Sequence, residues 1–457
     1  MDCGRKPIKF SILTLGCKVN QYESEALQKF FSDMGHGSCD SEGIKKGCHS
    51  LSKACDIYIV NTCAVTQKAA MQSRQAIRRA IRLNPEALMI VTGCYAQICP
   101  EKIADISGVD CVLGHLEKAN LYNHMAALLE NRNIVPMISV ENIHSVSSFQ
   151  DMPATPAGSR TRPFLKIQDG CSACCTYCIV PYARGKSRSL PSGKVLEKIR
   201  VLHNKGFHEV VLTGIHLGAY GQDLWPKTGL YDLLLQIREL NLIRRVRLSS
   251  IEPNELSPEI IELASQWEGL CSHFHIPLQS GDNDILKRMN RPYRREFFQD
   301  LVFNIRDQLP HAAIGADCLA GFPGETQEAF NNTHDLIANL PVTYLHVFPF
   351  SPRKGTPAWS YSEKIPAPEI KKRCLKMRVL GAEKKREFFE KFLGKKLDVV
   401  VEHQRDKGSG LLKAMSSNYI PVLIAGPDEL KNTMQSVKVT GLWKNAVKAE
   451  PLRFNVK

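Results

Sequence analysis

Long apolar runs are missing from this chain of 457 residues. No stretch of 18 or more apolar residues is present, which excludes a membrane-spanning helix. The first ten residues also lack the apolar core and cleavage site of a secretory signal. Because disulfides form mainly in oxidising compartments, we expect a cytoplasmic protein whose 16 cysteines are reduced. Reduced thiols are available to bind metal.

Acidic residues are scarce relative to basic ones. The chain has 60 Lys and Arg against 46 Asp and Glu, a formal net charge of +14, and a pI near 9.0. This surplus favours a polyanionic partner, RNA or DNA, although a generally basic soluble surface is the alternative. Hydrophobic residues make up 43% and charged residues 23%, which is ordinary for a soluble globular protein. The length predicts about three domains of ~150 residues.

The densest cysteine motif has only three thiols at the spacing of a cluster-binding array. Cys171, Cys175 and Cys178 form a C-x3-C-x2-C array in one short loop. Such thiolates bind a soft metal centre, and iron–sulfur clusters are held by cysteine thiolates. Three of them leave one iron of a four-iron cluster open. With Cys174 the loop also contains two abutting C-x2-C pairs, but zinc pairs are normally separated by roughly 12 to 20 residues. Inert thiols are the third interpretation.

This loop resembles the cluster loop of the radical S-adenosylmethionine (SAM) enzymes. The resemblance implies a 4Fe-4S cluster on Cys171, Cys175 and Cys178. In those enzymes the open iron chelates SAM, and an electron from the cluster cleaves SAM to a 5′-deoxyadenosyl radical. Cys174 is predicted to be a bystander.

Three more cysteines each follow a predicted β-strand. Cys17, Cys63 and Cys94 come directly after apolar runs that alternate with helical segments. That alternation predicts a parallel sheet with helices on both faces, and the carboxyl ends of its strands share one edge. We therefore expect the three thiols to converge on a second iron–sulfur site, with an idle cysteine as the alternative for each. The predicted strands cover residues 8–15, 57–60 and 88–91, with a short fourth strand at 111–113.

The strings around these cysteines resemble the signature of the radical-SAM methylthiotransferases. They are TLGCKVNQYES at 14–24, VNTCAVT at 60–66 and VTGCYAQ at 91–97. They are most similar to the MtaB-type branch, which acts on N6-threonylcarbamoyladenosine in tRNA. The resemblance implies an auxiliary 4Fe-4S cluster on the three thiols. The departure is residues 35–55, longer than the family needs and predicted to be a surface insertion. The cysteines at 39, 48 and 55 are expected to be idle.

Prolines at 153, 156 and 163 predict a linker over residues 146–163, between domains at 1–145 and 164–386. The second domain holds six strand candidates alternating with helices, which predicts a partial TIM-type (βα)6 barrel. The active site of such a barrel lies at the carboxyl ends of its strands, and the first strand leads into the Cys171 loop.

Other strand ends of this barrel are similar to the SAM and substrate pocket of the family. The resemblance implies cofactor-binding roles for four residues there, with loop stabilisation as the alternative for the polar ones. Histidines 216, 273, 275 and 346 are expected to be ordinary strand-end residues. The implied cofactor-binding residues are Gly214, Glu252, Gln279 and Asp317.

Residues 387–457 contain five short strand candidates between turns, which predict a small antiparallel β-barrel. In size and position this matches the TRAM domain with which the family holds tRNA. From 386 to 457 there are 13 Lys and Arg against 8 Asp and Glu. The helix predicted at 67–83 has five basic residues and no acidic one, so it is either a phosphate-contacting face or a solvated one.

The sequence thus predicts an α/β multidomain tRNA methylthiotransferase. The family resemblance implies methylthiolation at C2 of N6-threonylcarbamoyladenosine beside the anticodon, with the anticodon loop and a low-potential electron donor as partners. One SAM would yield the radical, the auxiliary cluster would present sulfur, and a second SAM would supply the methyl group. The alternatives are isopentenyladenosine in tRNA or a ribosomal protein as the target, and a non-catalytic RNA-binding iron–sulfur protein.

Overall fold

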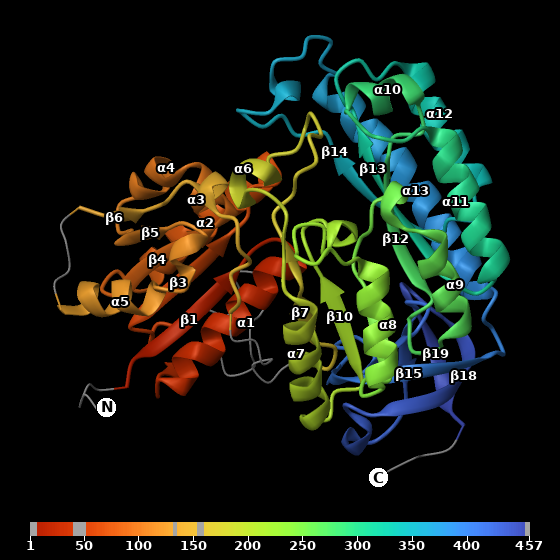
Figure 1. Ribbon diagram of the computed structural model, residues 1–457, viewed down its shortest axis with the longest axis horizontal. Coiled ribbons are helices and arrows are strands. Elements are labelled where there is room, and N and C mark those ends of the chain that lie inside the picture. Colours follow the sequence, from red (N-terminus) through yellow and green to blue (C-terminus); the bar gives the residue numbers. More distant parts are fainter. Residues whose placement is uncertain (1–6, 40–51, 131–134, 153–159, 453–457) are drawn as a thin grey trace.

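The computed structural model describes residues 7–39, 52–130, 135–152 and 160–452. The expected insertion and linker lie partly outside these ranges, and Cys48 lies outside them entirely. Figure 1 shows an N-terminal sheet unit, a central barrel and a small C-terminal barrel. Within the described ranges, no helix combines the length and apolarity that crossing a membrane requires.

The N-terminal unit is a six-stranded parallel sheet in the order β2-β1-β3-β4-β5-β6. The four central strands were predicted from sequence; the two edge strands were not, because each has only two or three residues and no apolar period. The strands are β1 (Lys9–Thr14), β2 (Gly37–Ser38), β3 (Ile57–Thr62), β4 (Leu88–Gly93), β5 (Cys111–Leu113) and β6 (Met137–Ser139).

Helices cover both faces of this sheet. Side chains of β3 alternate between two separate cores, since Ile57 and Ile59 enter one and Tyr58 and Val60 the other. Burial on both faces is what a parallel α/β sheet requires. The helices are α1 (Lys18–Asp33), α2 (Gln67–Leu83), α3 (Cys94–Ile98), α4 (Pro100–Ala104) and α5 (Leu121–Glu130).

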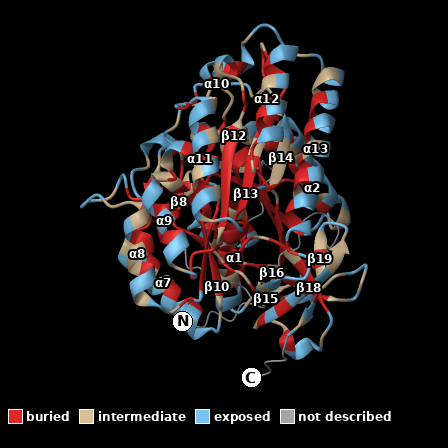
Figure 2. Cartoon of the chain, turned by 90° about the vertical axis from the view of Figure 1, so that its right-hand side faces the viewer, coloured by how far each residue is buried: buried red, intermediate tan, exposed pale blue. Residues whose placement is uncertain are grey.

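The central unit confirms the predicted partial barrel. Two three-stranded parallel sheets, β7-β10-β11 and β12-β13-β14, adjoin where Ile251 N donates to His275 O at 3.0 Å. Figure 2 shows β12 and β13 buried among surrounding helices. The strands are β7 (Phe164–Lys166), β10 (Glu209–Thr213), β11 (Arg245–Leu248), β12 (His273–Gln279), β13 (Ala313–Ala320) and β14 (Tyr344–Pro349). The principal helices are α7 (Ser192–Asn204), α8 (Leu230–Leu240), α9 (Pro258–Gln266), α11 (Arg295–Gln308), α12 (Gln327–Asn339) and α13 (Ala367–Glu390).

A closed five-stranded barrel forms the C-terminal unit, in the order β15-β16-β17-β19-β18. The predicted small antiparallel barrel is confirmed, with one exception, because β17 and β19 run parallel. A closed ring with an odd number of strands cannot alternate direction throughout. The strands are β15 (Lys396–Arg405), β16 (Leu412–Ser416), β17 (Pro421–Ile424), β18 (Met434–Trp443) and β19 (Ala446–Pro451).

The C-terminal barrel closes the central barrel at the amino ends of its strands. Arg245 in β11 donates to the carbonyl of Asp398 at 2.7 Å, and Arg247 donates to that of Ser417 at 2.9 Å. The Tyr419 ring stacks on His273 with centroids 4.1 Å apart. Access to the lumen is therefore through the other end, where the strands finish.

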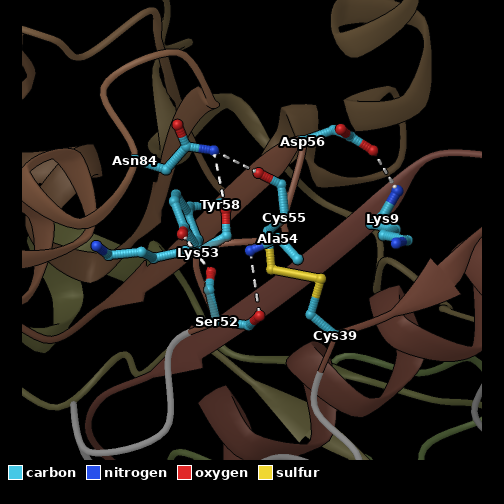
Figure 3. The surroundings of a disulfide bond; sticks show 9 residues. All are labelled: Lys9, Cys39, Ser52, Lys53, Ala54, Cys55, Asp56, Tyr58 and Asn84. Atoms are coloured by element: carbon cyan, nitrogen blue, oxygen red, sulfur yellow. Dashed lines mark hydrogen bonds between the residues drawn. A yellow bond between two sulfur atoms is a disulfide. The ribbon is translucent and has the colours of Figure 1, made fainter.

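Cys39 and Cys55 form a disulfide beside β1 (Figure 3). The expectation that every thiol is reduced is wrong for this pair. Cys39 directly follows β2 and Cys55 shortly precedes β3, and both strands pair with β1 around Phe10. This pairing brings their Cα atoms to 6.2 Å, which is within the range for a disulfide.

Candidate active site

Cys17, Cys63 and Cys94 follow the adjacent strands β1, β3 and β4 at the same edge of the N-terminal sheet. Their loops touch, because a Cβ added at Gly16 would lie 2.9 Å from Cys63 Cβ and 3.0 Å from its Sγ. The structure thus brings together the three thiols that the sequence placed at equivalent strand ends.

Asparagine side chains hold this edge in place. The Asn20 amide donates to the carbonyl of Leu15 at 2.8 Å and to that of Thr62 at 3.0 Å, so the first turn of α1 is tied to the ends of β1 and β3. Burial raises the pKa of Cys63 to about 12, with further contributions from the nearby Cys94 and Cys17. A thiol with so high a pKa stays protonated near neutral pH, and it becomes a ligand only when a cationic centre stabilises its thiolate form.

The second triad lies in the loop between β8 (Gln168–Asp169) and α6 (Val180–Arg184). Backbone hydrogen bonds fix this loop, since Cys171 N donates to Gly185 O at 3.0 Å and Cys178 N donates to Cys175 O at 3.1 Å. Burial, with smaller contributions from the other two thiols, raises the pKa of Cys178 to about 12. The side chain of Cys174 is exposed.

Two side chains missed from the sequence contact this triad. Arg291 donates from Nη1 to Cys175 Sγ at 3.3 Å and also pairs with Glu252. His216 has Nδ1 3.4 Å from Cys171 Sγ and Nε2 2.9 Å from Glu255 Oε1. Burial alone would lower the pKa of His216, but the hydrogen bonds to Cys171 and Glu255 raise it to about 10. His216 is therefore not an ordinary strand-end histidine.

Across the described ranges, His275, Asp317 and His346 form a group of three potential metal ligands whose donor atoms all lie within 4.8 Å of one another.

Buried positive charge beside Cys94 fits an anionic thiolate cluster. Burial raises the pKa of Cys94, and the nearby Arg184 guanidinium opposes that rise. Among the described residues, Arg184 Nε is buried with no hydrogen-bond partner. Donors of this kind normally have an acceptor in a native structure, and a sulfur-rich cluster would provide one.

Both triads lie at the open end of the central barrel. Gln67, at the start of α2, donates from its backbone N to Ser351 Oγ at 2.9 Å and from its side chain to the carbonyl of Pro352 at 3.1 Å. These residues follow β14, and the neighbouring Arg353 is close enough to Cys63 to interact with it electrostatically. The N-terminal thiols therefore adjoin the mouth in which the Cys171 loop lies.

The four predicted cofactor-binding residues have different surroundings. Glu252 adjoins the Cys171 loop through Arg291, whereas Gly214 packs against Gln168. Gln279 ends β12 at a bulge with φ of 66°. Asp317 accepts a hydrogen bond from His275, farther down the lumen. Their roles in SAM binding stay predictions.

Histidines missed as site residues line the lumen. His275 Nε2 lies 2.8 Å and His346 Nδ1 3.4 Å from Asp317 Oδ1. Burial would raise the pKa of Asp317, but these hydrogen bonds hold it well below its usual range. The His346 side chain is 53% exposed, so this wall of the lumen is accessible to a ligand. Period-2 alternation along β12 and β14 could have shown that these residues share the inner face.

Two family models match the chain. The one described as "Uncharacterized protein family UPF0004" covers residues 9–114, and "Radical SAM superfamily" covers residues 165–337. Each region contains one thiol triad.

Curated relatives cover nearly the whole chain. The threonylcarbamoyladenosine tRNA methylthiotransferase MtaB of Bacillus subtilis (strain 168) is 35% identical, covering 93% of this chain and 92% of the relative. The protein with the same description from Rickettsia prowazekii (strain Madrid E) is 38% identical, covering 92% of each chain. A tRNA-2-methylthio-N(6)-dimethylallyladenosine synthase from Pelotomaculum thermopropionicum is 31% identical, covering 95% of each.

Among solved structures, the radical SAM methyltransferase TsrM of Kitasatospora setae, with cobalamin and a 4Fe-4S cluster bound, matches with a TM-score of 0.56. It is 15% identical and covers 77% of each chain, so this likeness concerns the fold alone.

Proposed function

Because the chain belongs to the MtaB-type radical-SAM methylthiotransferases, we propose that it converts N6-threonylcarbamoyladenosine in tRNA to its 2-methylthio derivative. One observation carries the proposal: two separate triads, Cys17–Cys63–Cys94 and Cys171–Cys175–Cys178, adjoin one barrel mouth. The second triad alone suffices for SAM cleavage, and the first provides the separate site that sulfur transfer requires.

The two triads would each hold a 4Fe-4S cluster, and SAM would bind at the Cys171 site. When bound, these groups supply a 5′-deoxyadenosyl radical, a sulfur atom and a methyl group. Such chemistry suits the target, because C2 of adenine bears an unactivated hydrogen that no ordinary base removes. The barrel walls and the closed amino end would exclude water from the radical.

Arg291 and His216 would tune the Cys171 site. Both side chains contact ligand sulfurs, Arg291 as a cationic donor 3.3 Å from Cys175 and His216 through Nδ1 3.4 Å from Cys171. Hydrogen bonds to cluster sulfurs shift the reduction potential. Glu252 and Glu255 in turn fix the orientation of these two side chains.

The adenosine would enter from the single-stranded anticodon loop, whose bases can be splayed out into a protein pocket. The exposed His346 lies on the lumen wall, with Phe348, 44% exposed, two residues closer to the mouth. Rings on one strand face offer a stacking surface for a base.

Two basic surfaces would contact the rest of the tRNA. On α2, the basic side chains at 68, 78, 79 and 82 are exposed, whereas Arg74 donates to the Tyr95 hydroxyl. On the C-terminal barrel, Lys413, Trp443 and Lys444 line a groove of about 390 Å³. Lys448 Nζ lies 4.0 Å from the centroid of the Trp443 ring. Lysines beside a half-buried aromatic ring in a groove suit binding to phosphate and base together.

Nucleoside mass spectrometry of tRNA from cells with and without the gene tests this function. We expect the 2-methylthio adduct of threonylcarbamoyladenosine to disappear with the gene and to return on complementation. Loss of the adduct on dimethylallyladenosine instead would assign the chain to the other tRNA branch. A reduced, reconstituted protein that forms no 5′-deoxyadenosine from SAM would be an RNA-binding iron–sulfur protein only.

A further inference from the structure

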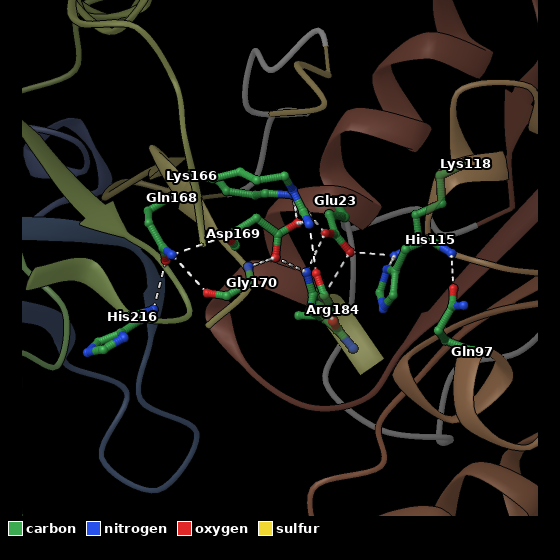
Figure 4. Close-up of polar contacts among 12 residues, drawn as sticks. Glu23, Gln97, His115, Lys118, Lys166, Gln168, Asp169, Gly170, Arg184 and His216 are labelled. Carbon is green, nitrogen blue, oxygen red and sulfur yellow. Dashed lines mark hydrogen bonds and ion pairs between the residues drawn. The ribbon is translucent and has the colours of Figure 1, made fainter. Parts of the chain in front are cut away.

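A buried cluster of charges joins the N-terminal sheet unit to the central barrel (Figure 4). Its carboxylates come from both units, Glu23 from α1 and Asp169 from β8. Arg184 of α6 lies between them with 1% of its surface exposed. A charge so deeply buried is costly unless it is paired and hydrogen-bonded, so the arrangement is well specified.

Arg184 bonds to both units at once. Its Nη1 lies 2.9 Å from Glu23 Oε1 and 2.8 Å from Asp169 Oδ1, and its Nη2 donates to Asn20 Oδ1 at 2.6 Å. A planar guanidinium can satisfy three partners in fixed directions, whereas an ammonium group cannot reproduce this fork.

Two of the three partners of Arg184, Asn20 and Asp169, continue to a cysteine loop. Asn20 holds the backbone just before Cys17 and Cys63 through its amide. Asp169 Oδ1 also accepts from Gly170 N at 2.8 Å, and Gly170 precedes Cys171. Arg184 is therefore connected to the Cys17 triad through Asn20 and to the Cys171 triad through Asp169.

The charges of this cluster do not balance. Lys118 and Lys166 pair with Glu23, Lys166 also lies 2.8 Å from Asp169, and Arg188 lies 3.9 Å from Asp169, so four buried cations including Arg184 face two carboxylates. Arg184 lies near Cys94, where its guanidinium opposes the rise in pKa that burial causes. An anionic metal centre on that thiol would complete the pairing.

We propose that Arg184 is a positioning residue, which locks the sheet unit onto the barrel and fixes the separation and orientation of the two thiol triads. This inference rests on the proposed function. Without the lock, SAM cleavage at the Cys171 site continues, but sulfur transfer from the Cys17 site to the substrate becomes inefficient.

Arg184→Gln and Arg184→Lys test the proposal, with Arg247→Gln as the matched control. Arg247 is equally buried and pairs with Glu209 at 2.7 Å, but it lies at the junction with the C-terminal barrel. The first measurement is hydrogen–deuterium exchange of the apoproteins. We expect exchange in peptides covering 15–25 and 166–186 to accelerate at least tenfold in both Arg184 variants and to stay within twofold of wild type in the control.

The second measurement is the amount of methylthio product per 5′-deoxyadenosine in the reconstituted enzymes. We expect this ratio to fall at least tenfold in Arg184→Gln, with iron content within about a tenth of wild type, so that both clusters are present, with SAM cleavage within about twofold, and with the ratio unchanged in Arg247→Gln. An unchanged ratio, or a parallel loss of both products in the Arg184 variants, would overturn the proposal. If Arg184→Gln does not fold, Arg184→Lys decides by the same criteria.

A wild-type enzyme that makes no methylthio product would instead refute the proposed function. The apoprotein exchange would then still decide whether Arg184 locks the two units together.

Discussion

Replacing Gly170 with alanine should remove the radical-generating site while leaving the rest of the chain folded. Gly170 has φ of 72°, and a Cβ there would lie 1.9 Å from Lys186 O and 2.8 Å from Gly185 O. Both are backbone atoms, so no side chain can move away to relieve the clash. The hydrogen bond from Cys171 N to Gly185 O must then break.

The cost can be approximated from its parts. A left-handed backbone conformation costs a residue with a Cβ about 1–2 kcal/mol. The lost hydrogen bond adds about 1 kcal/mol. A total of roughly 2–3 kcal/mol lowers the population of the ligand-competent loop about 30- to 150-fold, since 1.4 kcal/mol corresponds to a factor of ten.

Iron analysis after anaerobic reconstitution, together with the rate of 5′-deoxyadenosine formation, measures this effect. In Gly170→Ala we expect about half of the wild-type iron, held by the other triad, and at least a tenfold slower SAM cleavage. Gly193→Ala is the matched control, because a Cβ there meets no atom within 4 Å and alanine favours the helix α7. Full iron and wild-type SAM cleavage in Gly170→Ala would refute the reasoning.

Three further predictions concern acid stability, RNA affinity and the extra loop cysteine. Burial would raise the pKa of Glu23, but Arg184 and the neighbouring lysines hold it well below its ordinary value, so its stabilisation is present above about pH 4.5 and is lost as the pH falls below it. The thermal midpoint of wild type should therefore fall more steeply from about pH 5 to about pH 3 than that of Glu23→Gln, and parallel curves would contradict this. Arg78→Gln combined with Arg79→Gln should weaken tRNA binding. In a titration against KCl, the slope of log affinity against log salt concentration should fall by the equivalent of about two phosphate contacts, whereas an unchanged slope would exclude this face of α2. Cys174→Ser should retain the full wild-type iron content after anaerobic reconstitution. A loss of iron would show that Cys174 is a ligand.

The sequence was sufficient where a local pattern determines the structure. The helix predicted at 67–83 matches α2 at both ends. Its end followed from Asn84-Pro85, and the structure adds that Thr66 caps its start by accepting from Ala69 N. Convergence of Cys17, Cys63 and Cys94 followed from one physical rule, namely that parallel strands end at a common edge.

Contacts between distant residues could not be predicted in this way. Arg184 is 161 residues from Glu23, and Arg291 is 116 residues from Cys175. Neither arginine belongs to a periodic pattern or a spacing motif. Their roles depend on how the sheet unit and the barrel dock, which is set by tertiary packing rather than by local propensity.

The edge strands and the disulfide were missed for a related reason. β2 and β6 are too short to show alternation, and they become strands only by pairing with β1 and β5. Cys39 and Cys55 meet only because β2 forms. Short pairing partners of this kind leave almost no trace in the sequence.

Two triple variants, each lacking one thiol triad, test the division of labour between the two sites most directly. Each should retain about half of the wild-type iron after reconstitution. The protein without Cys17, Cys63 and Cys94 should still form 5′-deoxyadenosine from SAM but no methylthio nucleoside, whereas the protein without Cys171, Cys175 and Cys178 should form neither. Methylthio product from the first protein, or wild-type iron in either, would contradict the account of two clusters serving one barrel mouth.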